Sequence, residues 1–147
     1  MVLLSYIFYG FGFFIFLNSF MNLLRFEKYY FVQEWFDKYQ KVTGSRPKRS
    51  DFRSYSDYTI YKNRNLFITL EFFWICIGIF TNNWFIFLSL LIMGFILGLG
   101  LKKIKFTTID KLLTLVYLII KTFIYLFLFV NKFHLDLDIM KMITSFV

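Results

Sequence analysis

The sequence has few of the residue types on which common catalytic and structural sites depend. Its 147 residues include no alanine, one cysteine (Cys76) and one histidine (His134). These counts exclude a disulfide within the chain and a zinc site built from cysteine and histidine, and they make most triad chemistry unavailable. The sequence has no glycine-rich phosphate loop, nucleophile elbow or HExxH motif. We therefore expect no catalytic residue, no cofactor and no metal.

Hydrophobic side chains are far more abundant than in soluble proteins. They make up 59% of the chain, aromatic residues make up 24%, and phenylalanine alone occurs 23 times. Soluble domains are about half apolar and use alanine heavily. A soluble fold of this length has too little interior to bury so much apolar surface. The composition predicts an all-α integral membrane protein with about four transmembrane helices.

The net charge of +8 comes mostly from basic residues that lie between apolar runs. A basic chain can indicate nucleic-acid binding. The position of these charges instead indicates the cytoplasmic side of a membrane. We therefore expect contact with anionic lipid headgroups and with other membrane subunits, and no nucleic-acid partner. The sequence identifies no small-molecule substrate.

Apolar runs divide the chain into candidate transmembrane helices. Residues 1–24 carry no charged side chain and are long enough to cross roughly 30 Å of hydrocarbon. They lack a basic n-region and an Ala-x-Ala-like cleavage site, which favours a retained helix over a secretory signal. Residues 66–101 predict a helical hairpin with an uncharged turn at residues 81–83. Residues 112–130 form the last run.

Polar segments separate these runs. Residues 25–65 hold ten basic and five acidic residues. They begin with an amphipathic helix that either lies at the membrane interface or packs on a soluble partner. Gly44 and Pro47 are expected to end this helix. Residues 102–111 form a second basic loop, and residues 131–147 form a short amphipathic tail.

The charge of the connecting segments favours four crossings. Four crossings place both basic loops on one side and the uncharged turn on the other, in agreement with the positive-inside rule. Three crossings would place the basic loops on opposite faces. We therefore predict a multi-pass protein of a bacterial or organelle inner membrane. Residues 25–65 and 102–111 would lie on the cytoplasmic or matrix side.

Two charged residues interrupt the apolar runs, Glu71 in the second and Lys121 in the fourth. Each costs roughly 2.5–3.5 kcal/mol in hydrocarbon, so such residues are usually paired or functional. At about 1.5 Å per residue, they lie about 9 and 15 Å from the same side. We predict an ion pair between them. Its role is either structural, which we favour because a relay needs more ionisable groups, or a proton or ion step.

A polar stripe surrounds Lys121 at helical spacing, and we expect it to face protein or water. The other members of this stripe are Thr114, Tyr117 and Tyr125. The same reasoning applies to a weaker stripe in the first run. Its members are Ser5, Gly12, Ser19 and Asn22.

Gly94 and Gly98 form a GxxxG pattern in the third run. Such a pattern predicts the close approach of a second helix. Gly98 and Gly100 together are equally compatible with the end of that helix.

The first basic loop contains the candidate contacts with lipid or a partner. Its closeness to the membrane favours anionic headgroups over RNA. The candidate residues are Arg46, Lys48, Arg49, Arg53 and Trp35.

The tail places His134, Asp136 and Asp138 on alternate positions. In an extended chain they would face one way, as a metal site requires. One histidine and two spaced acids rarely complete a coordination sphere, so we favour an amphipathic tail at the interface.

Three functions are compatible with these features. The first is a non-catalytic structural or accessory subunit of a membrane assembly, and it needs no feature that is not observed. The second is a small oligomeric pore or transport protein, holin-like or ion-translocating, that uses Lys121 and Glu71. The third is an enzyme or energy-coupling subunit that uses the same pair.

Overall fold

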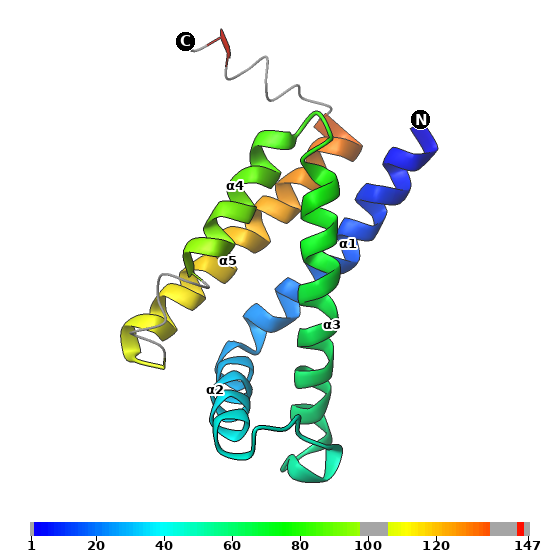
Figure 1. The fold of residues 1–147 in the computed structure, drawn as a ribbon. Helices are drawn as coiled ribbons and strands as arrows, with labels where there is room; N and C mark the ends of the chain where they lie inside the picture. Colours follow the sequence, from blue (N-terminus) through cyan, green and yellow to red (C-terminus); the bar gives the residue numbers. More distant parts are fainter. Residues whose placement is uncertain (1, 98–105, 136–143, 146–147) are drawn as a thin grey trace.

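The computed structural model describes residues 2–97, 106–135 and 144–145. In these residues the chain forms five α-helices and no strand, which confirms the prediction of an all-α fold (Figure 1). The helices are α1 (Val2–Leu24), α2 (Phe26–Thr43), α3 (Tyr55–Gly78), α4 (Trp84–Phe95) and α5 (Thr108–Val130). A 3-10 turn lies at Arg49–Asp51, and a π-helical turn at Asn131–Leu135 continues α5.

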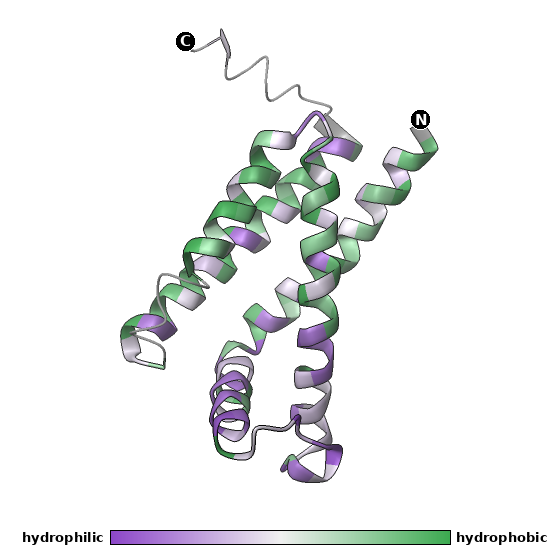
Figure 2. Ribbon diagram, in the orientation of Figure 1, coloured by the Kyte–Doolittle hydropathy of each residue, from purple (hydrophilic) through white to green (hydrophobic). Residues whose placement is uncertain are grey.

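The helices form two parts of different polarity. α1, α3, α4 and α5 form an apolar bundle, in which α1 packs along α5 and against α3, and α4 folds back along α3 (Figure 1). α2 and the N-terminal half of α3 form a polar lobe at one end of this bundle. Figure 2 shows α3 changing from hydrophilic to hydrophobic along its length, so this one helix belongs to both parts.

Local sequence signals set the ends of these helices. α2 ends at Gly44, as expected, where a φ of 64° lies in the left-handed region that glycine adopts without strain. α3 begins after Ser54, whose side chain accepts a hydrogen bond from the backbone N–H of Asp57. α5 begins in the same way after Thr107, which accepts from the N–H of Asp110. Such hydroxyl caps satisfy N–H groups that have no partner within the helix.

The caps extend two helices beyond their expected bounds. α3 runs without a break from Tyr55 to Gly78, so it crosses the boundary expected between the polar segment and the apolar run at residues 65 and 66. α5 begins at Thr108 and not at residue 112. Both helices start inside polar segments, where a hydroxyl cap fixes the start and apolar periodicity gives no signal.

Two helices, α1 and α5, are long and apolar enough to cross a membrane. Length and composition do not show the four crossings expected from the sequence. α4 has 12 residues, and only the C-terminal half of α3 is apolar. Residues 98–101, which the expected third run includes, lie outside the described residues.

The largest buried cluster surrounds Trp74 of α3, whose side chain is 3% exposed. Its indole Nε1 donates a hydrogen bond of 3.0 Å to the carbonyl oxygen of Phe8 on α1. Its ring meets those of Phe87 on α4 and Tyr125 on α5 edge to face, with centroid distances of 5.0 and 5.4 Å. Trp74 therefore joins α3 to the other three helices of the bundle.

Two glycines make room for these rings. A Cβ atom at Gly12 on α1 would overlap the indole ring of Trp74. A Cβ atom at Gly78, the last residue of α3, would overlap the ring of Phe87. Glycine is therefore required at both positions by close packing of aromatic side chains against a helix backbone.

Gly94, the first glycine of the GxxxG pattern, makes an ordinary contact among the described residues. A Cβ atom there would lie 3.6 Å from the hydroxyl oxygen of Tyr117, which is an ordinary contact. Gly98 lies outside the described residues. The close helix approach expected at Gly94 and Gly98 therefore stays a prediction.

We expect Gly12→Ala to destabilise the protein by about 1–3 kcal/mol, because the added methyl group has no space beside Trp74. Gly10→Ala is the matched control, since nothing lies within 4 Å of a Cβ at Gly10. It should be neutral or stabilising, because alanine favours a helix over glycine by up to about 1 kcal/mol. Unfolding in detergent micelles measures both. Equal stabilities would show that the contact with Trp74 is not tight.

Candidate functional site

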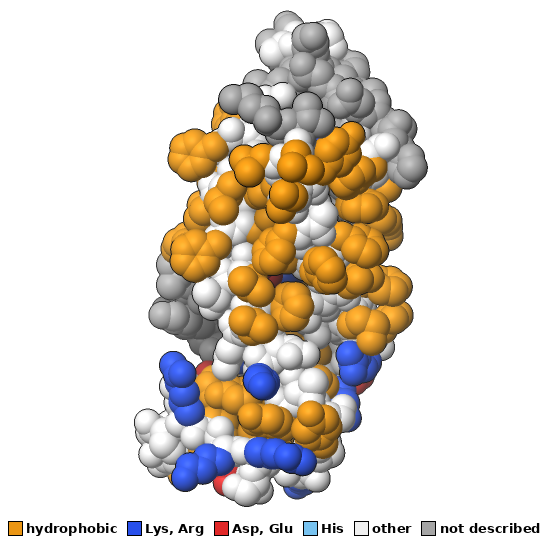
Figure 3. All heavy atoms as spheres, turned by 90° about the vertical axis from the view of Figure 1, so that its right-hand side faces the viewer, with side chains coloured by type: hydrophobic (Ala, Val, Ile, Leu, Met, Phe, Trp, Pro, Cys, Tyr) orange, Lys and Arg blue, Asp and Glu red, His pale blue; other side chains and the backbone are white. Residues whose placement is uncertain are grey.

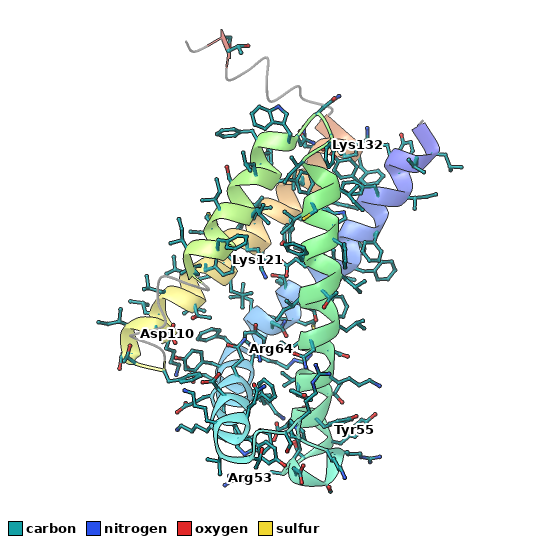
Figure 4. All side chains as sticks on the ribbon, in the orientation of Figure 1. Arg53, Tyr55, Arg64, Asp110, Lys121 and Lys132 are labelled. Atoms are coloured by element: carbon teal, nitrogen blue, oxygen red, sulfur yellow. The ribbon has the colours of Figure 1, made fainter. Side chains whose placement is uncertain are left out.

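Two largely buried charges near the middle of the bundle form an ion pair between α3 and α5. Lys121 Nζ lies 2.9 Å from Glu71 Oε1 and 3.3 Å from Glu71 Oε2. The side chains of Lys121 and Glu71 are only 13% and 16% exposed. Figure 4 shows Lys121 between α5 and α3, at mid-height of the bundle. The structure thus brings together the two charges that interrupt the apolar runs.

Two tyrosines of the polar stripe surround this pair. The hydroxyl of Tyr125 donates a hydrogen bond to Glu71 Oε1. Lys121 Nζ lies 5.3 Å from the ring centroid of Tyr117 and 6.0 Å from that of Tyr125, within the range of cation–π attraction. We call Glu71, Lys121, Tyr117 and Tyr125 the charge cluster. Within it, the carboxylate and the ammonium neutralise one another.

A cavity of about 630 Å³ reaches the charge cluster from the polar lobe. Four helices line it, and α3 and α5 each contribute residues at helical spacing along one stripe. The α3 residues are Arg64, Ile68, Glu71, Phe72 and Ile75. The α5 residues are Asp110, Thr114, Tyr117, Leu118 and Lys121. Thr114, Tyr117 and Lys121 of the polar stripe on α5 therefore belong to the wall of this cavity.

The two remaining walls differ in polarity. α2 contributes Tyr29, Gln33, Phe36 and Asp37. α4 and the two residues after it contribute Leu90, Leu91, Gly94, Phe95 and Leu97. The cavity is therefore polar near the lobe and apolar along α4. Cavities of about 300–1,000 Å³ with this mixture are typical of small-molecule sites.

Asp110 joins α5 to the lobe. Apolar periodicity gave no signal for this residue, and it was not among the candidate site residues. Its Oδ2 accepts hydrogen bonds of 2.8 Å from the hydroxyl of Tyr30 on α2 and from the N–H of Phe106. Burial, and then the hydrogen bond with Asp110, raise the pKa of Tyr30 well above its usual value. The spacing Thr107-x-x-Asp110 is a capping-box pattern and is the signal that would have found this residue.

The weaker stripe on α1 also faces the interior in part. Ser19 and Thr122 on α5 are buried and lie 2.8 Å apart through their hydroxyl oxygens. Thr122 donates its proton to the carbonyl oxygen of Leu118, so Ser19 donates to Thr122. This hydrogen bond adds a polar contact to the longest helix interface of the bundle.

Polar side chains also meet at the far end of the bundle. Asn83 Nδ2, in the turn after α3, donates a hydrogen bond of 2.8 Å to the hydroxyl of Tyr9 on α1. Lys132 Nζ lies 5.8 Å from the ring centroid of Tyr9 and 6.0 Å from that of Tyr6. The start of α1, the α3–α4 turn and the end of α5 therefore share one end of the molecule (Figures 1 and 4).

The four basic candidates for lipid contact lie on the surface of the polar lobe, whereas Trp35 lies within the lobe. Arg46, Lys48, Arg49 and Arg53 are exposed, and Arg53 lies at the foot of the lobe in Figure 4. Trp35 is half-buried, with its ring 4.7 Å from that of Phe52. The indole thus packs within the lobe, because the connector folds back over α2.

The described residues contain no group of three metal-ligating side chains. Asp136 and Asp138, and the side chain of His134, lie outside the described part of the chain.

We expect Lys121→Met to lower the free energy of unfolding by about 3–5 kcal/mol, because it leaves the buried carboxylate of Glu71 without its cation. The double variant with Glu71→Gln should recover a large part of this loss, since it buries no net charge. Unfolding titrations in mixed micelles measure both single variants, Lys121→Met and Glu71→Gln, and the double variant. Lys62→Met, at an exposed position of α3, is the control. Additive losses in the double variant would show that the pair is not coupled.

Comparisons with known proteins give no family for this chain. Its sequence matches no protein-family model, no curated protein and no solved structure.

Proposed function

We propose that the chain crosses a membrane four times and acts as a non-catalytic structural or accessory subunit of a membrane assembly. The observation that carries this proposal is the band of exposed hydrophobic side chains around the bundle, bordered at one end by basic residues (Figure 3). Every helix of the bundle contributes to the band, with examples in Phe14, Phe73, Phe95 and Phe123, each more than half exposed. Soluble monomers rarely expose apolar patches larger than roughly a few hundred Å².

The spacing of polar contacts along the bundle supports a bilayer around it. Asp110 and Lys132 are 22 residues apart on α5 and its continuation, which is about 33 Å. Tyr6 and Arg25 are 19 residues apart on α1 and just beyond it, which is about 28 Å. The hydrocarbon core of a bilayer is about 30 Å thick. The apolar band therefore has the height of one hydrocarbon layer.

The position of the α3–α4 turn supports four crossings over two. Asn83 in this turn contacts Tyr9, which lies near the end of the bundle opposite the lobe. α3 thus extends from the basic lobe to the far polar end, as α1 and α5 do. Basic residues are concentrated on the lobe, which favours the cytoplasmic or matrix side for residues 25–65 and 102–111.

The charge cluster supports a structural role. Both oxygens of Glu71 contact Lys121, and one also accepts from Tyr125. A proton or ion carrier must exchange partners, and a carboxylate with all its contacts inside the protein resists such exchange. The exposed basic side chains of the lobe remain available to anionic headgroups and to other subunits.

A small oligomeric pore or transport protein is the second candidate. The cavity supports it, because Lys121 lines a space that also reaches the polar lobe. This function requires copies of the chain, or a moving helix, to extend the cavity through the far end of the bundle.

Labelling of single cysteines tests the number of crossings. Cys76→Ser removes the native thiol, and Ser50, Asn82 or Lys103 is then replaced by cysteine. In a bacterial inner membrane, we expect an impermeant maleimide to label position 82 in intact cells, and positions 50 and 103 only after permeabilisation. Labelling of positions 50 and 103 from opposite sides would contradict four crossings. Labelling of all three from the same side would indicate a re-entrant hairpin.

Copurification separates the two candidate functions. After mild solubilisation of the native membrane, a tagged full-length chain should elute in one peak with other membrane proteins identified by mass spectrometry. Glu71→Gln should leave this association intact, because the charge cluster is internal. A tagged membrane protein of similar size controls for non-specific capture. A discrete oligomer of this chain alone would refute the subunit proposal and favour the pore.

A further inference from the structure

The cavity has a guanidinium group at its polar end, and one nitrogen atom of this group lacks a hydrogen-bond partner among the described residues. This atom is the buried Nε of Arg64. The guanidinium lies 5.8 Å from the ring centroid of Phe36 on α2. Stacking on an aromatic face leaves the in-plane N–H groups free to bind an anion. The acidic neighbour in this wall, Asp37, is already paired with Lys41 at 3.0 Å.

The rest of the cavity offers an apolar path that leads away from Arg64. Ile68 and Phe72 of α3 and Phe95 of α4 are each about half exposed, so the cavity opens to the surface of the bundle. Ile75 and Leu90 are buried and close its deep end. Ile75 is 11 residues beyond Arg64 on α3, which is about 16 Å along the helix.

We propose that this cavity binds an anionic phospholipid from the surrounding bilayer, with the phosphate at Arg64 and one acyl chain between α3 and α4. This inference rests on the membrane placement proposed for the chain. Arginine matches the geometry of a phosphate through parallel N–H donors. Basic pockets between transmembrane helices on the cytoplasmic side are known to hold anionic headgroups.

The charge cluster fits this occupant. Glu71 lies seven residues beyond Arg64, about 10 Å deeper in the cavity. Because Lys121 neutralises it, the pair adds no net charge beside the lipid. In this arrangement the polar groups of the pair lie at the depth of the lipid's ester carbonyls, between the phosphate at Arg64 and the acyl chain. The apolar wall of α4 contacts the acyl chain beyond them.

Native mass spectrometry of the purified full-length protein in detergent tests the proposal. The probes are phosphatidylglycerol and phosphatidylcholine with identical acyl chains. We expect phosphatidylglycerol to bind more tightly, and Arg64→Gln to weaken its binding at least about tenfold, the effect of losing a charge-assisted hydrogen bond. Lys62→Gln is the matched control, because it removes the same charge from an exposed position of α3 outside the cavity.

A second variant locates the acyl chain. Gly94→Leu places a side chain in the cavity and should weaken binding of both lipids, whereas Gly10→Leu, outside the cavity, should not. Equal loss with Lys62→Gln and Arg64→Gln, unchanged binding by Gly94→Leu, or equal affinity for the two lipids would each overturn the proposal. Because the assay is done in detergent and without partners, its failure leaves the results of labelling and copurification unaffected.

Discussion

The salt bridge between Glu71 and Lys121 connects two helices whose backbones stay apart. α1 packs closely along α5 and against α3, whereas α3 and α5 meet through side chains, namely this ion pair and Tyr125, which contacts both Glu71 and Trp74. The cavity lies along the gap between the two helices, and Glu71 and Lys121 are part of its wall. The ion pair and the cavity therefore lie at the same helix interface.

Aromatic packing holds the four helices of the bundle together beside this gap. Trp74 contacts α1, α4 and α5 from a single position on α3, and Gly12 gives its ring room against the backbone of α1. Tyr125, whose ring packs against that of Trp74, also donates a hydrogen bond to Glu71. The apolar core and the charge cluster thus share one side chain, so the position of the carboxylate depends on the packing of the core. This coupling suits a fixed pair better than one that exchanges partners.

The polar lobe extends this arrangement beyond the bundle. Asp110 links the first turn of α5 to Tyr30 on α2, and Lys28 on α2 forms an ion pair with Asp57 in the first turn of α3, at 3.4 Å. Each link involves the first turn of a helix, where a carboxylate is favoured by the helix dipole. The lobe is therefore held by carboxylates in the first turns of α3 and α5, and many of its basic side chains lie on the surface (Figure 3).

Much of the architecture follows from local patterns. Apolar runs predicted the helical class, Gly44 predicted the end of α2, and depth along two runs placed Glu71 and Lys121 within reach of one another. The capping residues Ser54 and Thr107 can be read from the sequence, but they lie in polar segments, where apolar periodicity does not predict a helix start. These features are local because helix formation, capping and hydropathy depend on residues within a few positions of one another.

Only the tertiary structure decided which glycines are tightly packed, which tyrosine contacts Glu71, and that Trp35 packs within the lobe. It alone brought Arg64 and Lys121 to the wall of one cavity. Each of these facts depends on the distance and rotation between helices that are remote in the chain. The sequence determined what each helix can present on its faces, because a helix repeats every 3.6 residues. Which face meets which neighbour is settled by the packing of all the helices together.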